Sequence, residues 1–327
     1  MTSQGLLVNI RNMLNFYPKK YGFGIEITSS TVRVAVVEKK GPSLSAPFVK
    51  SADLPWGMVT ESYSVPNIMD LDELTLQVKE CLAGAAQFKI RRAALSLPDS
   101  IFRVQTLEFD DLPRKTQEQE RLVRWRLEKA AAFDTADTVL RYQVLRRQDT
   151  GFTVLACVAK RAVLSQYETL LANLGYEPWA IGLSSFHVLN FYASAMKQKS
   201  PVFALAHVTG DSFATLISEG GGVRFYRFKE LKKGSTDDVR ARLMREIEDS
   251  LHFYMHRDRS QPSEVGHLYL SGEPAAYDAL TRGFTDMESL TVEVLSPSAV
   301  LASRSRTGPD SEFPLTLAAA LGAGGSL

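Results

Sequence analysis

A repeated pair of short predicted strands constrains the fold of this chain more than any other feature of its sequence. Residues 24–32 align with residues 205–213 at a constant offset of 181, and the register continues to 38 and 219. Each copy has an apolar strand, one polar residue, a turn of Ser, Thr, Gly or Asp, and a second strand. A further strand and a helix follow each copy. The order β-β-β-α-β-α, found twice, predicts two similar domains that face a cleft.

The length of the chain agrees with two domains, because one hydrophobic core rarely grows past about 250–300 residues and the chain has 327. We expect an N-terminal arm at 1–21 and a first domain at 22–198. That domain carries an inserted subdomain at about 98–160, and the second domain is 199–327. The polar residues 197–200 mark the internal boundary.

Charge and cysteine content exclude several classes of protein. The 38 basic and 37 acidic residues give a net charge of +1, which argues against a nucleic-acid-binding protein. Cys81 and Cys157 are too few for a disulfide framework or a Cys-rich zinc site, and they favour a reducing compartment. The longest apolar runs, 152–159 and 201–206, are much shorter than the about 20 residues of a spanning helix. We therefore expect no spanning helix, and the first residues do not have the pattern of a signal peptide.

Two basic segments each have two interpretations. In residues 1–17 the apolar side chains fall on one helical face: Leu6, Ile10, Met13 and Tyr17. We expect a frayed arm, because short isolated helices are marginal in water, and the alternative is a membrane- or partner-docking helix. Residues 114–147 hold nine Lys and Arg against five Asp and Glu. We interpret them as a solvated helix face, with a docking surface for an acidic or amidic partner as the alternative.

Apolar periodicity and cap residues predict the other elements. Strands are expected at 23–27, 31–38, 93–97, 103–109, 138–145, 152–159, 178–182, 201–208, 213–218, 223–228, 267–271 and 291–295. A helix is expected from an N-terminal cap at Asp70 to Ala85, and another from 164 to a C-terminal cap at Gly175. Further helices are expected at 116–132, 184–197, 236–255, 274–284 and 315–321. Residues 42–66 contain four prolines and are predicted to be irregular.

The tip of each predicted hairpin has the chemistry of a phosphate site. Small residues let backbone N–H groups approach phosphate oxygens, and hydroxyls add donors. A carboxylate at the end of the first strand can hold Mg²⁺ through water. The first hairpin offers Glu26, Thr28, Ser29 and Ser30, and the second offers Asp211 and Ser212.

Several motifs resemble the PilM family, actin-like cytoplasmic proteins of type IV pilus assembly. The residues that carry the resemblance, which extends from about 22 to 323, are 24–32, Leu97-Pro98-Asp99, 128–133, Tyr142-Gln143-Val144-Leu145, 246–254, 267–272, 292–297 and 315–322. The resemblance implies an α/β, actin-like fold, which is a duplicated ribonuclease H-like fold of two domains with a small inserted subdomain. It also implies a scaffold at the inner face of the cytoplasmic membrane.

The phosphate motifs depart from the family's pattern. Where the family usually has Asp-Ile-Gly, this chain has Glu26-Ile27-Thr28 and His207-Val208-Thr209. Threonine restricts close approach of the backbone, and imidazole is a poor ligand for Mg²⁺. In the adenosine motif only Gly272 remains of a glycine run. We expect a degenerate nucleotide cleft formed by the two hairpin tips and Gly272, with no cofactor, no metal and no catalytic residue.

The resemblance further implies binding of the N-terminal cytoplasmic tail of a PilN-like membrane protein. The groove would lie beside the insert, near Leu95, Leu97, Pro98 and Phe133. Other pilus platform proteins, the assembly ATPase and a second copy are further expected partners, and membrane association would pass through the partner. Two alternatives stay open: an active actin-like ATPase that binds MgATP, and a component like GspL of type II secretion.

Overall fold

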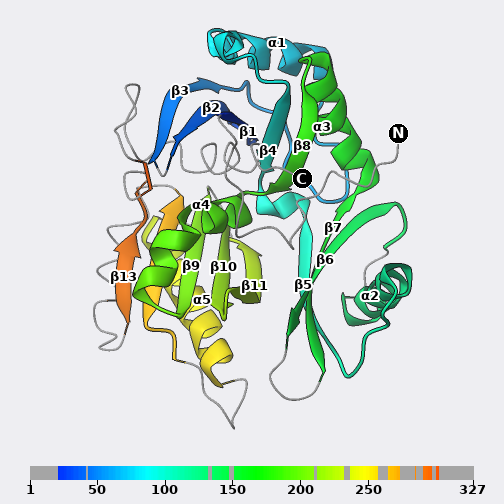
Figure 1. The fold of residues 1–327 in the computed structure, drawn as a ribbon, viewed down its shortest axis with the longest axis vertical. Helices are drawn as coiled ribbons and strands as arrows, with labels where there is room; N and C mark the ends of the chain where they lie inside the picture. The colour runs from blue at the N-terminus through cyan, green and yellow to red at the C-terminus, as the bar shows by residue number, and fades with distance from the viewer. Residues whose placement is uncertain are drawn as a thin grey trace. The chain divides into compact units, whose positions relative to one another are not determined.

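The computed structural model describes residues 21–41, 43–131, 135–146, 151–209, 212–231, 236–256, 264–272, 284, 290–296 and 300–301. These residues form two compact units (Figure 1). The first unit runs to Phe191 and includes Leu301, and the second is Tyr192–Val300. The division falls inside one helix, α4 (Ser184–Lys199).

The first unit contains a five-stranded sheet in the order β3-β2-β1-β4-β8. Its strands are β1 (Tyr21–Ile27), β2 (Thr31–Lys40), β3 (Ser43–Asp53), β4 (Arg92–Leu97) and β8 (Glu177–Leu183). β1 pairs antiparallel with β2 and parallel with β4, and β4 pairs parallel with β8. β1 is the middle strand of this sheet, and six of its seven residues are buried. This burial is expected of a central strand whose two faces are both covered.

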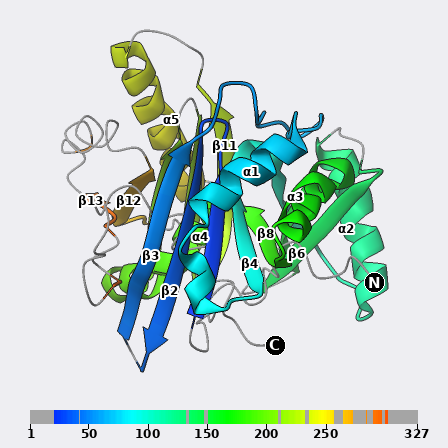
Figure 2. The same cartoon turned by 90° about the horizontal axis from the view of Figure 1, so that it is seen from above.

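Helices α1 (Leu71–Cys81) and α3 (Arg161–Asn173) contact each other and the strands of this sheet (Figure 2). The predicted cap of α1 is confirmed, since the Asp70 carboxylate accepts a hydrogen bond from the Glu73 amide at 2.9 Å. α3 ends as predicted at Gly175, which has a φ of 82°. The amides of Gly175 and Tyr176 donate to carbonyls of the last turn, which is a Schellman end.

A subdomain is inserted between β4 and α3. It consists of the short helix η3 (Asp99–Ile101), β5 (Arg103–Phe109), α2 (Thr116–Ala131), β6 (Thr138–Arg146) and β7 (Phe152–Lys160). The strands form an antiparallel sheet in the order β5-β7-β6. α2 packs on it over a separate apolar cluster that includes Leu107, Val123, Leu127 and Val154. The insert therefore has a core of its own.

The second unit repeats the strand order of the first, as β11-β10-β9-β12-β13. Its strands are β9 (Val202–Thr209), β10 (Ser212–Glu219), β11 (Gly222–Glu230), β12 (His267–Gly272) and β13 (Thr291–Val294). The helix α5 (Thr236–His256) turns its apolar stripe, which includes Leu243, Ile247 and Leu251, into the core of this unit. The clearest helical periodicity of the sequence thus predicts this helix correctly.

Strand register confirms the repeat residue by residue. In the first hairpin Glu26 lies opposite Arg33, and in the second His207 lies opposite Ala214. The parallel neighbours match as well, with Glu26 beside Ser96 and His207 beside Ser271. For the hairpin partners the offset is the 181 residues of the sequence alignment. The expected duplicated α/β architecture of two domains is confirmed.

One prediction of the sequence is wrong. Residues 43–53, which we expected to be irregular because of the nearby prolines, form β3. β3 is an edge strand that pairs only with β2, and its register shifts between Val36 and Glu38. Pro47 falls at this shift, where no ladder hydrogen bond needs its missing N–H. The predicted helix at 315–321, and all of the one at 274–284 except Phe284, lie outside the described residues.

Candidate functional site

The first phosphate-like turn is built on a buried ion pair. Glu26, near the end of β1, is 2% exposed, and its Oε1 lies 3.0 Å from a guanidinium nitrogen of Arg33 on β2. Opposite strand positions bring the two side chains to one face. A buried carboxylate needs such a partner, so a Mg²⁺ ion at this position would have to replace the contact with Arg33.

The backbone N–H groups of Ser29, Ser30 and Thr31 in the turn all donate to side-chain oxygens of the chain itself. The amides of Ser30 and Thr31 donate to Oγ1 of Thr28, at 3.3 and 3.0 Å. The amide of Ser29 donates to Oε1 of Glu61, at 2.7 Å. A phosphate bound at a hairpin tip would use these same donors. In this structure a phosphate at the turn would meet the Glu61 carboxylate rather than a free N–H donor.

Glu61 reaches the turn from the segment between β3 and α1. The segment starts at the turn, where the Leu54 amide donates to the Ser30 carbonyl at 2.7 Å. Its other end is held by α3, because Oε1 of Gln166 accepts hydrogen bonds from the amides of Asn67 and Ile68. Glu61 is therefore positioned by contacts on both sides rather than by an exposed loop. Sequence reasoning missed this residue, since nothing local marks it.

The equivalent position in the second unit carries a different buried polar contact. His207 is 2% exposed, and its Nδ1 lies 2.7 Å from Oγ of Ser271 on the neighbouring strand. At the turn itself the Ser212 hydroxyl donates to the Thr209 carbonyl at 3.1 Å. Asp211 and Gly210 lie outside the described residues.

Gly272, the remaining glycine of the adenosine-like motif, has a structural reason to be glycine. Its φ is 114°, and a Cβ at this position would lie 1.7 Å from the carbonyl oxygen of Val208 on β9. Close strand packing thus requires glycine here whether or not a nucleotide binds. The residue does not by itself argue for a cofactor.

The predicted partner-binding residues divide into two groups. Leu95 and Leu97 have no exposed surface in the central strand β4, and Pro98 is buried at its end. Phe133 lies outside the described residues. In this conformation β4 gives its side chains to the core, and their role in partner binding stays a prediction.

The junction of β4 and the insert holds a polar cluster that the sequence did not reveal. Asp99 is 4% exposed, and its Oδ1 accepts from the Ser184 hydroxyl at 2.9 Å and the Ser185 amide at 3.1 Å. The Ser185 hydroxyl donates to Oδ2. Asp99 therefore caps the N-terminus of α4, where a negative charge is favourable. Burial and the nearby Asp99 raise the pKa of the Cys157 thiol well above its usual value.

Next to this junction, Arg103 of β5 connects the insert with the segment that carries Glu61. Its guanidinium lies 4.5 Å from the ring centroid of Tyr63 and donates to the carbonyls of Ser100 and Phe102. Cation–π contact and hydrogen bonds hold the side chain in place. Arg103 and the edge strand β5 are thus an ordered, exposed border of the insert.

In the described part of the chain, no group of three or more His, Cys, Asp or Glu side chains has the arrangement of a metal site. Of the helices described, none is both long enough and apolar enough to span a membrane.

No protein-family profile and no curated protein matches the sequence. Among solved structures, a chain of the PilM-PilN type IV pilus biogenesis complex matches with a TM-score of 0.75 and 20% identity, over 93% of this chain and 97% of that one. Two further matches have TM-scores of 0.48 and 11% identity. One is a Bacteroides thetaiotaomicron protein with an actin-like ATPase fold, covering 90% of this chain and 95% of that one.

The other is the cytoplasmic domain of EpsL, an inner membrane component of the type II secretion system of Vibrio cholerae, covering 91% of this chain and 93% of that one. With the strand order of its two units, the first match establishes the architecture. The chain has an actin-like, duplicated α/β fold with an inserted subdomain, and its structure is PilM-like.

Proposed function

We propose that the chain is a cytoplasmic scaffold of a type IV pilus machine, which binds the N-terminal tail of a PilN-like membrane protein and does not turn over ATP. The observation that carries the proposal is the match over nearly the full chain to a chain of the PilM-PilN complex. In this proposal the scaffold lies at the inner face of the cytoplasmic membrane, held there by its partner. Other platform proteins and the assembly ATPase would contact it there.

The state of the first turn supports a role without nucleotide. Its backbone donors at Ser29, Ser30 and Thr31 are bonded within the chain, and Glu26 is paired with Arg33. Binding a phosphate would first break these contacts and desolvate the Glu61 carboxylate beside an anion. The phosphate-like motif of the first turn is thus proposed to be a structural remnant.

The first test is titration of the purified chain with a fluorescent ATP analogue in the presence of Mg²⁺. We expect no saturable binding at micromolar concentrations and no release of phosphate above background. The proposal of a nucleotide-free scaffold fails if the analogue binds at micromolar concentration and Glu26→Ala abolishes that binding. The ion pair with Arg33 makes Glu26 the most informative position.

The second test concerns the partner. An extended tail adds backbone hydrogen bonds along a strand edge or groove, and β5 is an edge strand of the insert with the exposed residues Arg103 and Gln105. The probe is a labelled peptide with the cytoplasmic tail sequence of a short single-span membrane protein encoded beside this chain. We expect saturable binding that Arg103→Glu weakens at least tenfold.

The matched control is Glu118→Lys on α2, a charge change on an exposed side chain of the same insert. It should bind the peptide as the unmodified chain does. If the peptide does not bind the unmodified chain, the tail-binding proposal is wrong. If both variants weaken binding equally, the border at Arg103 is not the site.

A further inference from the structure

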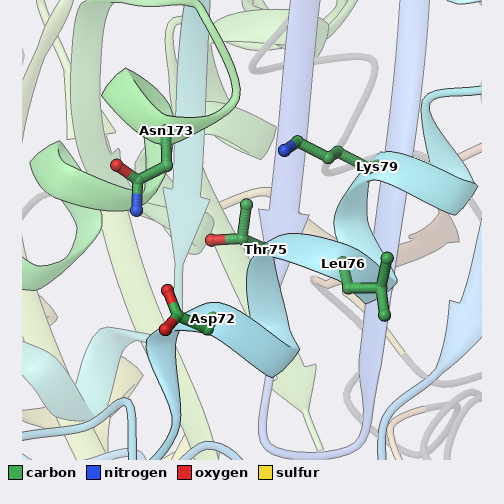
Figure 3. Close-up of a pocket in the computed structure, with 5 residues that line it drawn as sticks. All are labelled: Asp72, Thr75, Leu76, Lys79 and Asn173. Carbon is green, nitrogen blue, oxygen red and sulfur yellow. The ribbon is translucent and has the colours of Figure 1, made fainter.

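A recess on the surface of the first unit has little chemistry that would select a ligand. It holds about 460 Å³ beside α1 and the end of α3, and it is lined by Asp72, Thr75, Leu76, Lys79 and Asn173 (Figure 3). Its one carboxylate and one ammonium have opposite charges. The exposed imidazoles of the second unit, by contrast, are side chains that bind transition-metal ions.

Two histidines lie on the exposed surface of α5. The chain has five histidines, and His252 and His256 are the exposed ones. His187 and His207 are buried, and His267 is half-buried with an inaccessible Nδ1. The two cysteines are buried as well. The end of α5 is therefore where the chain offers two accessible imidazoles together.

The spacing of the pair suits a chelate. Residues four apart lie one turn apart on the same side of a helix, and the ring centroids of His252 and His256 are 6.1 Å apart. Two imidazoles on one Zn²⁺, with Zn–N distances of about 2.0–2.1 Å, have their ring centres about 5–6 Å apart. Small side-chain rotations therefore bring a nitrogen of each ring to one ion, and the backbone does not have to move.

A backbone contact orients one of the two rings. Nδ1 of His256 lies 2.9 Å from the carbonyl oxygen of His252. Because a carbonyl only accepts, Nδ1 carries the proton in this contact. The lone pair of the neutral ring is then on Nε2. Metal-binding histidines have this arrangement in proteins, with the other ring nitrogen donating to a carbonyl or carboxylate.

Packing on β10 and β11 fixes the end of α5 that carries the pair. Between the two histidines, the ring of Phe253 packs against Phe225 of β11 with centroids 5.9 Å apart. The Tyr254 hydroxyl donates to a carboxylate oxygen of Glu219 on β10 at 2.6 Å. The last turn of a helix also favours a cation, because its carbonyl groups carry a partial negative charge.

Local charge does not select the ion here, because both signs are present. Glu248 and Asp249 lie about one turn before His252, and Arg245 lies about one turn before them, with its Nε donating to the Ala241 carbonyl. Among the described residues, no third His, Cys, Asp or Glu completes a three-ligand group. Selectivity therefore rests on the two imidazole nitrogens.

We propose that His252 and His256 bind a divalent transition-metal ion of the Zn²⁺, Ni²⁺ and Cu²⁺ class as a two-imidazole chelate, with water in the remaining positions. These ions accept imidazole ligands, whereas Mg²⁺ and Ca²⁺ prefer oxygen. The ion bridges the last turn of α5, so binding stabilises the folded second unit. This site departs from the expectation of a chain without a metal, and it does not depend on the proposed function.

Calorimetric titration of the full chain with Zn²⁺ tests the proposal, on protein purified without a histidine tag. We expect saturable binding of one ion per chain below about 100 µM, since the second imidazole meets the ion at a high effective concentration. Mg²⁺ at the same concentration should not bind. His256→Ala should weaken binding at least about tenfold. Zn²⁺ should raise the melting temperature of the natural chain and leave that of His256→Ala unchanged.

A matched control keeps the number of histidines and changes only their spacing. His256→Ala/Phe253→His puts the two imidazoles on adjacent residues, which do not share one side of a helix. The position tolerates the change because Phe253 is 61% exposed. This variant should bind as weakly as His256→Ala. His256→Ala/Glu248→His rebuilds the four-residue spacing with His252 and should restore binding.

Three results would overturn the proposal. The first is the absence of saturable Zn²⁺ binding to the natural chain. The second is equal affinity in the natural chain and in the variant with adjacent histidines, because single imidazoles would then hold the ion. The third is a variant with rebuilt spacing that binds no better than His256→Ala, because the four-residue spacing would then not produce the site.

Discussion

Glu26 and His207 occupy the same position of the repeated hairpin, but their buried side chains have different polar partners. Glu26 has a cation opposite, Arg33, whereas His207 has Ala214 opposite and bonds sideways to Ser271. A buried polar group has to be bonded wherever it stands. The two half-sites are therefore no longer equivalent chemically, although their backbones still are.

A second histidine gives a prediction for the pH dependence of stability. His187 on α4 is 3% exposed, and burial lowers its pKa to about 4, from an ordinary value of 6.5. The unfolded chain therefore binds a proton that the folded chain does not between these two values. We expect stability that is complete above pH 6.5 and lost by about 3 kcal/mol as the pH falls to 4.

Urea unfolding of His187→Leu across this pH range checks the prediction. The variant should have a visibly flatter dependence of unfolding free energy on pH than the natural chain. His252→Leu is the control, because that side chain is exposed, and it should keep the natural slope. An unchanged slope in His187→Leu would contradict the assignment.

Gly272 gives a prediction about packing. Gly272→Ala forces a Cβ to within 1.7 Å of the Val208 carbonyl oxygen at a φ of 114°, so we expect destabilisation of more than about 3 kcal/mol. Gly266→Ala is the matched control in the same unit, because nothing lies within 4 Å of its added Cβ. Thermal unfolding of both variants measures the difference, and equal stability of the two would refute it.

At the scale of elements, the N-terminus of α4 is capped by a residue that is distant in the sequence. Asp99 is 85 residues from Ser184, and its carboxylate accepts three hydrogen bonds from the first two residues of α4. We expect Asp99→Ala to destabilise the chain by about 3 kcal/mol, because it leaves buried donors without an acceptor. Denaturant unfolding measures the loss.

The control for this change is Asp110→Ala, at an exposed position at the end of β5, which should cost less than about 0.5 kcal/mol. Asp99→Asn should lie between the two, since an amide oxygen still accepts part of the network. An Asp99→Ala variant as stable as Asp110→Ala would show that the cap does not matter.

Elements follow from the sequence where the signal is local. The stripe of α5 and the cap of α1 are set by residues within a few positions of one another, and both predictions were correct. β3 was missed because its proline signal opposes strand formation and only pairing with β2 overrides it. Glu61 and Asp99 act over 32 and 85 residues, and no local pattern reports such contacts.

For the whole molecule, two units with separate cores should unfold in two steps. The core of the second unit contains Leu251, which is 1% exposed, and Leu171 of the first unit is fully buried. We expect calorimetry to show two transitions, because multi-domain chains depart from two-state behaviour. Leu251→Ala should lower the midpoint temperature of one transition only, and Leu171→Ala that of the other only. Each substitution should reduce the free energy of unfolding of its own unit by about 2–5 kcal/mol.

A single transition that both variants lower equally would show that the units unfold together. The duplication itself was predictable, because the repeat at a constant offset matches the register of the two hairpins. The full strand order of the first unit was not, since β3 was missed. The candidate site was less predictable. The sequence shows which side chains lie at a turn, but it does not show which oxygens already accept hydrogen bonds from the backbone N–H groups of that turn.

The first and last strands of the insert, β5 and β7, are neighbours in its sheet, so the two ends of the insert lie close together. Arg103, at the start of β5, pairs with Val158, near the end of β7, so both ends of the subdomain leave the first unit about 5 Å apart. A segment whose ends meet can be gained or lost in one genetic event without moving the strands of its host. The length and sequence of the insert can therefore change while the strand order of the host sheet stays the same.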